Sequence, residues 1–317
     1  PGPERFWWSI EVDFGQKFPL RYQGELAGPI GKTQVIFERV VTAPPDDNIP
    51  RIAFMDMQGR KGVIRNQVES RTDEQELLLN RPNQLALSTA TNPFYITLYK
   101  MREYVLNWRF YSAFRVANDK IRKPVPIEQE PILHEDGGNL SAVLFYLMTE
   151  QRMAFDELES VMRSMVPGFQ GITVKARGRG EVIAFWQEQG IDRELSLADL
   201  SDGILRLLCW SALCVLPSPP KLICIDEPDQ GVHPRTLPVL AGLFKKASKR
   251  TQIFLATHAS YFLTQFDLSD IAIMRKIKGA SEFVKPASSD LMRTMLEDFG
   301  TEELEHLHRS DELELLS

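Results

Sequence analysis

The sequence predicts an α/β fold, and three observations lead to this prediction. An apolar run at 222–225 has no polar face, which is typical of a strand buried on both sides of a parallel sheet. A second apolar run at 252–256 follows after a helical pattern, so the final third alternates strand and helix. Residues 6–41 instead form short aromatic and β-branched runs separated by Gly and Pro, which indicates antiparallel β structure.

The composition is that of an ordinary globular protein. Of the 317 residues, 43% are hydrophobic and 25% are charged, and the net charge of −6 argues against a dominant nucleic-acid-binding surface. No apolar run reaches the roughly 20 residues that a membrane-spanning helix needs, and the first residues do not resemble a signal peptide. Cys209, Cys214 and Cys224 lie in apolar surroundings without metal-ligand spacing. We therefore expect buried thiols in a protein of the reducing cytoplasm.

The first two thirds of the chain are expected to pass from β structure to helices and back. Apolar residues at helix spacing begin at about Asp73, and Asn139 is a candidate helix cap. A proline-rich stretch at 120–131 is expected to be an extended crossing. The predicted elements after residue 50 are strands at 51–57 and 62–66, helices at 74–87, 93–112, 141–151 and 154–165, and β structure at 171–188.

The final third contains the regular alternation of strand and helix. Pro234 fits the first turn of the helix that separates two strands. The predicted elements are a buried helix at 202–215, a strand at 221–225, a helix at 234–250, strands at 252–256 and 272–275, and an acidic helical tail.

Asp226 and Glu227 follow the first of these strands directly. Open α/β sheets bind ligands at the carboxyl ends of their strands, so both carboxylates are placed at a candidate site. One acid can hold Mg²⁺ while its neighbour handles a water molecule. A strand that ends in a solvated acidic turn is an equal alternative when this segment is taken alone.

Two further segments carry chemistry in the same region. Ser201 precedes the buried helix, with Gly203 behind it, which is a helix start that can bind an anion. A plain helix cap is the commoner explanation of such a serine. His258 ends the strand at 252–256, and a right-handed crossover makes that strand a parallel neighbour of the strand at 221–225. Glu227 and His258 are therefore predicted to face the same crevice.

The order of these segments resembles the second half of an ABC-type ATPase head. The matching motifs are LSDG at 200–203, LICIDEP at 222–228, GVHP at 231–234 and ATH at 256–258. The chain is most similar to the RecF, SMC and OLD-like branch, whose single-chain members are often described simply as AAA-family ATPases. The resemblance extends to HEDGGNLSAVL at 134–144 and to the acidic tail, so it covers most of the chain.

This resemblance implies a P-loop NTPase fold that binds ATP and Mg²⁺ and hydrolyses ATP between two heads. Asp226 would help to hold Mg²⁺, Glu227 would polarise the attacking water, and His258 would contact the γ-phosphate. A signature loop would touch the ATP of a second subunit, and a D-loop would lie beside it. The residues implied for these two loops are Ser201, Asp202 and Gly203, and then Gln230, Gly231 and His233.

Four parts of the chain follow from the resemblance. They are an antiparallel β part of the head at 1–70, a helical insertion subdomain at 71–190, the ATPase core at 191–285 and the acidic helical tail at 286–317.

A phosphate-binding loop of the form G-x-x-x-x-G-K-[ST] is missing from this sequence. Gly31, Lys32 and Thr33 match its end, but Leu26 stands where the first glycine belongs, and the surroundings alternate like a hairpin. We expect that a segment on the order of 50 to 70 residues, with the first strand, the phosphate loop and the first helix, has been removed from this chain or is supplied elsewhere.

The leading functional hypothesis is a dimeric ATPase head that couples its nucleotide state to DNA or to an effector protein, in anti-phage defence or DNA repair. The effector would be a nuclease or a toxin. The alternative is a hydrolysis-deficient scaffold that holds such an effector. A basic and aromatic segment at 99–123 is a candidate DNA contact, although a helix with a solvated basic face explains it more simply.

Overall fold

A computed structural model describes residues 5–285 apart from 30, 47, 69–70, 115, 117–118 and 278–279. The helical tail predicted at 286–317 lies outside the described residues. The chain divides into two compact units, Pro1–Asn107 and Trp108–Ser317, and the four-part division by residue range stays a prediction. No helix in the described part of the chain has the length and apolarity needed to cross a membrane.

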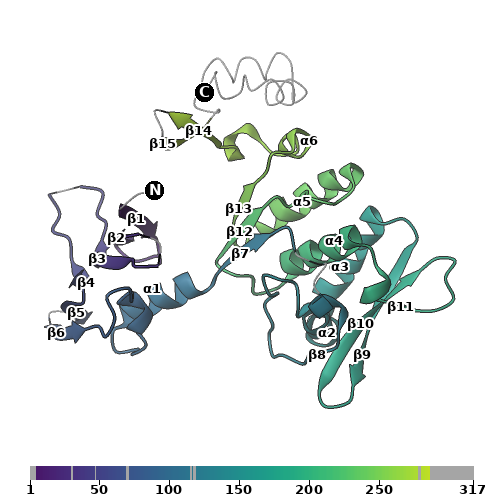
Figure 1. Cartoon of the computed structure of the whole chain (residues 1–317), viewed down its shortest axis with the longest axis horizontal. Coiled ribbons are helices and arrows are strands. Elements are labelled where there is room, and N and C mark those ends of the chain that lie inside the picture. Colours follow the sequence, from purple (N-terminus) through teal and green to yellow (C-terminus); the bar gives the residue numbers. More distant parts are fainter. Residues whose placement is uncertain are drawn as a thin grey trace. The chain divides into compact units, whose positions relative to one another are not determined.

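Unit 1 is built on an antiparallel meander of six strands in sequential order (Figure 1). This confirms the β structure predicted for the first 70 residues. Alternate side chains of the second and third strands enter a core of their own, as the period-two pattern requires. The strands are β1 (Arg5–Val12), β2 (Leu20–Ala27), β3 (Gln34–Thr42), β4 (Ala53–Gln58), β5 (Lys61–Val68) and β6 (Arg71–Leu78).

The helix predicted at 74–87 is wrong throughout its range, because residues 71–78 form a strand and the first α-helix among the described residues begins at Ile96. Residues 71–78 form β6, which pairs with β5 and places Glu74 opposite Arg65 in an ion pair of 2.6 Å. Strand pairing supplies backbone partners that outweigh the helix propensity of this glutamate- and leucine-rich run. The later helix is also shorter than predicted, because α1 ends at Leu106 (Ile96–Leu106) and 108–112 form a strand.

A buried glutamate ties the meander to the segment that follows it. Glu38 on β3 is fully buried and accepts hydrogen bonds from Tyr22 Oη (2.9 Å), Ala86 N (2.5 Å) and Leu87 N (3.0 Å). Burial raises the pKa of this carboxyl, although the three donors oppose the shift. The short 3-10 helix η1 (Leu87–Thr89) is thereby held against the sheet.

Unit 2 contains a three-stranded parallel sheet in the order β13-β12-β7 (Figure 1). Its strands are β7 (Trp108–Ser112), β12 (Leu222–Asp226) and β13 (Gln252–Ala256). The predicted parallel pairing of the last two is confirmed, with Asp226 opposite Ala256. The helix η4 (Pro234–Thr236) and α5 (Leu237–Ala247) form the crossover between them.

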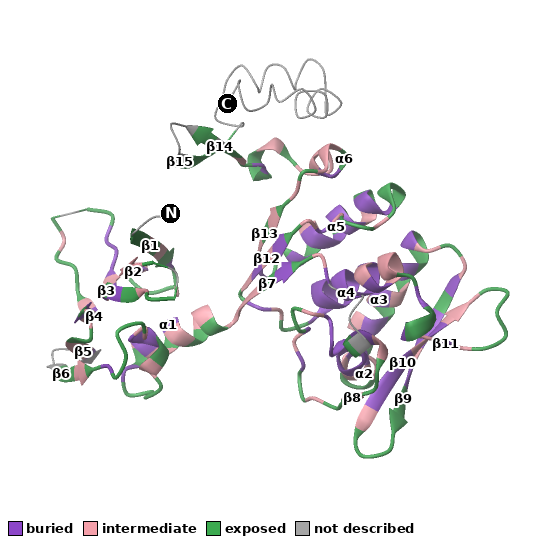
Figure 2. Cartoon of the chain, in the orientation of Figure 1, coloured by how far each residue is buried: buried purple, intermediate pink, exposed green. Residues whose placement is uncertain are grey.

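A second, antiparallel sheet and several helices complete unit 2. The buried helix predicted at 202–215 is confirmed as α4 (Asp202–Val215), and Figure 2 shows its burial. The β structure predicted at 171–188 is confirmed as the antiparallel pair β9 (Phe169–Arg177) and β10 (Glu181–Glu188). The remaining elements are η2 (Asp119–Arg122), β8 (Val125–Pro126), α2 (Leu140–Glu150), α3 (Arg152–Met165), β11 (Leu195–Ser196), η3 (Leu197–Asp199), α6 (Ser260–Leu263), η5 (Leu268–Asp270), β14 (Ile273–Ile277) and β15 (Ala280–Val284).

Only one face of the parallel sheet is covered within the described residues, so the prediction that β12 is buried on both sides is wrong. Ile223 and Ile225 join the main core of unit 2 together with residues of α4 and α5. Phe110 and Phe254, which flank Cys224 in register on the opposite face, remain 55% and 52% exposed. Parallel sheets in proteins are almost always covered on both faces, which makes this apolar surface unusual.

Candidate nucleotide site

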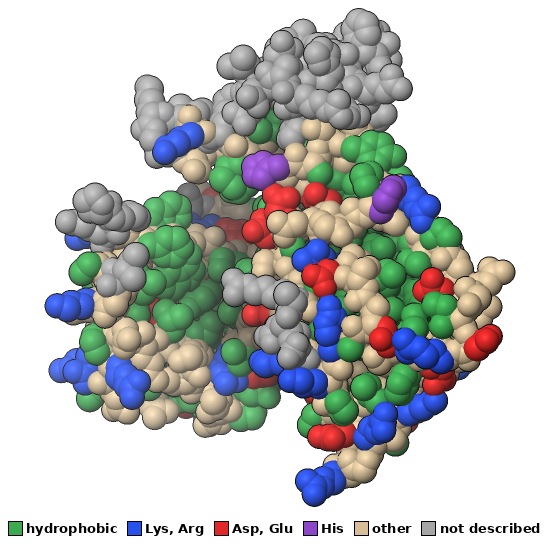
Figure 3. Space-filling model, turned by 45° about the vertical axis from the view of Figure 1, so that its right-hand side comes forward, with side chains coloured by type: hydrophobic (Ala, Val, Ile, Leu, Met, Phe, Trp, Pro, Cys, Tyr) green, Lys and Arg blue, Asp and Glu red, His purple; other side chains and the backbone are tan. Residues whose placement is uncertain are grey.

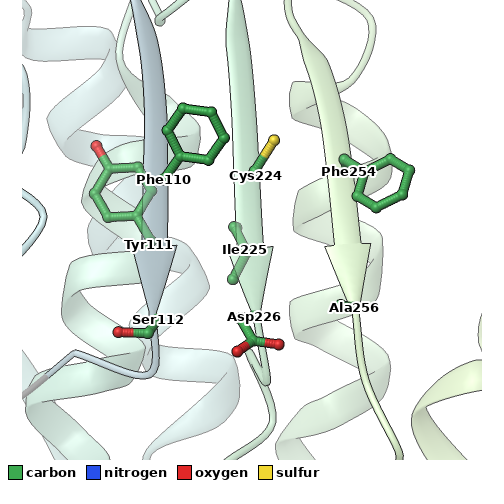
Figure 4. Close-up of a pocket in the computed structure, with 8 residues that line it drawn as sticks. All are labelled: Phe110, Tyr111, Ser112, Cys224, Ile225, Asp226, Phe254 and Ala256. Carbon is green, nitrogen blue, oxygen red and sulfur yellow. The ribbon is translucent and has the colours of Figure 1, made fainter. Parts of the chain in front are cut away.

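The candidate site begins at the carboxyl ends of the three parallel strands. Asp226 lies between Ser112 and Ala256 in the register of the sheet. All three residues line a pocket of about 390 Å³, together with Phe110 and Cys224 on the uncovered face (Figure 4). The predicted metal ligand is therefore solvent-exposed and shares its pocket with a hydroxyl oxygen.

Sequence reasoning did not identify Ser112 as part of this site. Its segment was expected to continue the helix at 93–112, so no strand end was predicted there. The aromatic alternation around Trp108 and Phe110 was the signal that could have revealed the third strand.

Glu227 follows Asp226 and turns sharply away from the sheet. Its φ of 52° lies in the left-handed region, where residues other than glycine are strained. The backbone N–H of Glu227 donates to the Ala256 carbonyl at 2.8 Å, which ties the turn to the neighbouring strand. His258 Nε2 lies 3.9 Å from Glu227 Oε1. The structure thus brings these two residues together at one edge of the sheet, as their positions in the sequence suggested.

A side-chain link joins the two turns that carry Glu227 and His258. Thr257 Oγ1 donates to Asp229 Oδ1 at 2.5 Å and accepts the Ala259 N–H at 3.0 Å. Gln230 N donates to the Glu227 carbonyl at 3.1 Å and closes the first turn. Sequence reasoning overlooked Asp229, because nothing in the linear pattern separates it from a solvated loop acid.

The segment predicted as a signature loop forms the start of α4. Ser201 is its N-cap, and its hydroxyl oxygen accepts the Ile204 N–H at 3.3 Å. This bond uses one lone pair and leaves the hydroxyl hydrogen free to donate. Asp202 Oδ1 accepts from Arg122 Nη2 at 2.8 Å. The negative charge of Asp202 would repel a phosphate, and the ion pair with Arg122 offsets that charge.

The segment predicted as a D-loop packs against the start of α4. A Cβ added to Gly203 would lie 2.8 Å from the Gly231 carbonyl oxygen, so the close approach of the two backbones requires a glycine at 203. Gly231 has a φ of 73°, in the left-handed region that favours glycine, and the Arg206 guanidinium lies beside it. Gln230 is exposed, while His233 Nδ1 accepts the Arg235 N–H at 3.2 Å and starts the short helix η4.

The loop at 134–139 packs against the same helix. Gly137 has a φ of 69°, and a Cβ added to it would lie 3.3 Å from Cys209 Sγ of α4. The Gly138 N–H lowers the pKa of Asp136, and Lys120 donates to the same carboxylate at 3.1 Å. Asn139 accepts the His134 N–H at 2.8 Å. The side chains of Asp136 and Asn139 thus hold the backbone of the loop, and Lys120 binds the loop from outside.

The cysteines agree with their predicted role in part. Cys209 and Cys214 are buried in α4, and burial raises the pKa of both thiols, which keeps them protonated. Cys224 differs, because its side chain lies in the pocket on the uncovered face of the sheet. No group of three potential metal ligands occurs among the residues that the structure describes.

The sequence Gly31-Lys32-Thr33 does not form a phosphate loop. It lies in the turn between the antiparallel strands β2 and β3, where the Lys32 N–H donates to the Pro29 carbonyl at 2.9 Å. A phosphate loop joins a strand to the N-terminus of a helix. The hairpin expected around these residues is therefore confirmed.

The basic segment at 99–123 does not form one helical surface. It is divided between α1, β7 and η2, and it crosses the boundary between the two units; Arg115 lies outside the described residues. Lys120 and Arg122 are paired with Asp136 and Asp202. On the side of the molecule that Figure 3 draws, Lys and Arg side chains are interspersed with Asp and Glu. DNA binding by this segment stays a prediction.

Comparison with known proteins gives one family match. Residues 68–264 match the family described as "AAA domain, putative AbiEii toxin, Type IV TA system". This range includes β7, the loop at 134–139, α4, β12, β13 and the turn at His258. No curated protein matches the chain.

Several solved SMC heads are similar to parts of the chain. An SMC head bound to the C-winged helix domain of ScpA has 12% identity and a TM-score of 0.46, and the match covers 84% of this chain and 75% of that one. An SMC head domain from Thermotoga maritima has 12% identity and a TM-score of 0.33, and the match covers 84% of this chain and 74% of that one. An SMC head with an extended coiled coil, bound to the C-terminal domain of ScpA from Pyrococcus furiosus, has 12% identity and a TM-score of 0.45, and the match covers 89% of this chain and 80% of that one.

Proposed function

We propose that this chain is the catalytic part of an ATP-hydrolysing head. The chain belongs to the family described as "AAA domain, putative AbiEii toxin, Type IV TA system". This agrees with its resemblance to ABC-type ATPases of the SMC and RecF-like branch. Its fold is the mixed α/β fold of such a head, which contains antiparallel β structure as well as a parallel sheet. The observation that carries the proposal is the convergence of Asp226, Glu227 and His258 at the carboxyl ends of β12 and β13.

The donor atoms at this edge suit a hydrated Mg²⁺ ion. Asp226 offers an exposed carboxylate, and Ser112 offers a hydroxyl in the same pocket. Mg²⁺ is commonly held by one or two carboxylates and several waters, with phosphate oxygens completing the shell. Bound Mg²⁺ would neutralise charge on the phosphates. Glu227, off the strand axis and 3.9 Å from His258, is placed to orient a water beside them.

The uncovered sheet face supports the proposal that a further segment completes the site. Phe110, Cys224 and Phe254 form an apolar row across the three strands, two residues before Ser112, Asp226 and Ala256 on the same face. An element that covers this row would end beside the Asp226 carboxylate. A phosphate loop followed by a helix fits that place, because its apolar side would cover the aromatic row and its N–H groups would face the phosphates.

The signature start and the D-loop support action as a dimer. Ser201 keeps a free hydroxyl donor, Asp202 is neutralised by Arg122, and Gly203 lies against Gly231. We propose that this combined surface meets the ATP of a second head. The family description names a putative toxin and a type IV toxin–antitoxin system, which favours a role in defence. We further propose that the effector is a toxin or a nuclease and that the assembly binds DNA.

ATP turnover by the full-length protein tests the proposal, with Glu227→Gln as the decisive variant. We expect the variant to lose about 100-fold or more in kcat, since it removes the group that orients the water. ATP-dependent dimers should persist, measured by size-exclusion chromatography with light scattering. Turnover at the wild-type rate would exclude Glu227 as the catalytic base.

A non-hydrolysing scaffold that holds an effector is the second candidate function. It is favoured if the wild-type full-length protein binds ATP but does not turn it over. Glu130→Gln serves as a matched control for the charge change, because Glu130 also has a left-handed φ, 46°, but lies in the 127–131 loop rather than at the candidate site. It should hydrolyse ATP like the wild type.

A further inference from the structure

The link between Asp229 and Thr257 has no part in the chemistry described so far. It is a half-buried hydrogen bond of 2.5 Å between two turns that come from different strands. One turn carries Glu227 and the other carries His258. The resemblance to ABC-type ATPases implies no role for Asp229 or for Thr257.

The two turns are joined at two points. The Glu227 N–H donates to the Ala256 carbonyl, and Thr257 Oγ1 donates to Asp229 Oδ1. The first bond is formed by the backbone and survives any substitution that leaves the backbone intact. The second depends wholly on two side chains, so it can be removed without deleting either catalytic candidate.

Thr257 has a further task within its own turn. Its hydroxyl oxygen accepts the Ala259 N–H at 3.0 Å, so the backbone on both sides of His258 is fixed by one hydroxyl group. The His258 side chain itself is 94% exposed and has no hydrogen bond to fix it among the described residues; only the 3.9 Å approach to Glu227 is present. The direction of His258 is therefore set by the backbone that carries it.

The geometry points to Asp229 and Thr257 as a positioning pair that holds His258 in register with Glu227. This inference rests on the proposed function, because it matters only where a water and a phosphate lie between the two residues. A hydroxyl that both donates to a carboxylate and accepts from the backbone allows little freedom. Misplacing a reacting group by about 1 Å can cost about 100-fold in rate.

The test compares Thr257→Val, which keeps the shape but removes the hydroxyl, with Thr257→Ser, which restores it. In the full-length protein we expect Thr257→Val to lower kcat about 10- to 100-fold. The KM for ATP should change less than about threefold, because the pair touches no substrate in this arrangement. Thr257→Ser should recover most of the rate, which a role in packing alone would not produce.

Asp229→Ala provides the second arm. It should lower kcat by no more than Thr257→Val does, because Thr257→Val also removes the acceptor of the Ala259 N–H. The double variant should be no slower than Thr257→Val alone, because both substitutions remove the same link. Effects that multiply in the double variant, or a Thr257→Val variant with the wild-type kcat, would overturn the positioning role.

Amide exchange separates failure of this inference from failure of the proposed function. The Ala259 amide should exchange at least about 10-fold faster in Thr257→Val and remain slow in Glu227→Gln, since only the former removes its acceptor. If the wild type hydrolyses no ATP, the proposed function fails, and the exchange data still decide whether the link fixes the His258 turn. Unchanged exchange in both Thr257→Val and Asp229→Ala would contradict the inference whatever the turnover.

Discussion

Glu38 shows how a single buried residue can hold two segments together and make stability depend on pH. It accepts three hydrogen bonds within the core of unit 1, from Tyr22 and from the backbone at 86 and 87. Burial nevertheless raises the pKa of its carboxyl above the ordinary value of 4.5. The same burial, with Glu38 as the neighbouring charge, raises the pKa of Tyr22.

Glu38→Gln should remove a pH dependence of stability that the wild type shows. Because the folded-state pKa is raised, the folded protein binds more protons than the unfolded chain between the two pKa values. The contribution of Glu38 to stability is complete below the unfolded value of 4.5 and declines as pH rises through the folded value. Denaturant titrations at several pH values should show the wild type losing stability relative to Glu38→Gln as pH rises. A difference that grows in the opposite direction would contradict the raised pKa.

At the scale of elements, α4 organises the candidate site. Ser201 caps its first turn, Asp202 of this turn pairs with Arg122, and Gly203 packs against Gly231 of the segment predicted as a D-loop. About two turns further along, Cys209 lies against Gly137 of the polar loop at 134–139. The helix therefore contacts both loops at glycine positions.

Gly137→Ala should destabilise unit 2, because it combines a left-handed φ with a close contact to Cys209 and Ile121. We expect a loss of roughly 1–3 kcal/mol in the free energy of unfolding. Gly178→Ala is the matched control, since an added Cβ there would meet nothing within 4 Å. It should stay within about 0.5 kcal/mol of the wild type. Chemical denaturation measures both, and equal stability of the two variants would show that the loop tolerates a Cβ.

At the scale of the whole molecule, the described residues form two separate cores, one in each unit. Met57 is fully buried in the core of unit 1, and Leu208 is fully buried in the core of unit 2. The uncovered face of the parallel sheet belongs to unit 2 alone, and it is where the candidate metal ligand lies. We therefore expect substitutions in the core of unit 1 to change the stability of that unit without changing the geometry of the candidate site in unit 2.

Core substitutions should act on one unit at a time. Met57→Ala should lower the protection of unit 1 amides by roughly 2–5 kcal/mol, and Leu208→Ala should do the same for unit 2. Hydrogen exchange resolved by peptide in low denaturant separates the two responses. If either substitution lowers protection equally in both units, the chain unfolds as one cooperative body.

Short-range pattern in the sequence was sufficient for much of this fold. Alternation predicted the meander of unit 1, the apolar run predicted β12, and the right-handed crossover predicted that β13 lies parallel beside it. The approach of Glu227 to His258 followed from the same rule. Local propensity failed at 71–78 and at 108–112, where pairing with β5 and with β12 turned expected helices into strands.

By itself, the sequence determined the alternation of strand and helix in the final third and the residue types at those strand ends, because both follow from periodicity and covalent spacing. Only the tertiary structure decided which side chains act on one another across the chain. It placed Ser112 beside Asp226, neutralised Asp202 with Arg122, and linked Asp229 to Thr257. It also left one sheet face apolar and uncovered, which a hydropathy pattern cannot reveal, since burial depends on what packs against a strand as well as on its own residues.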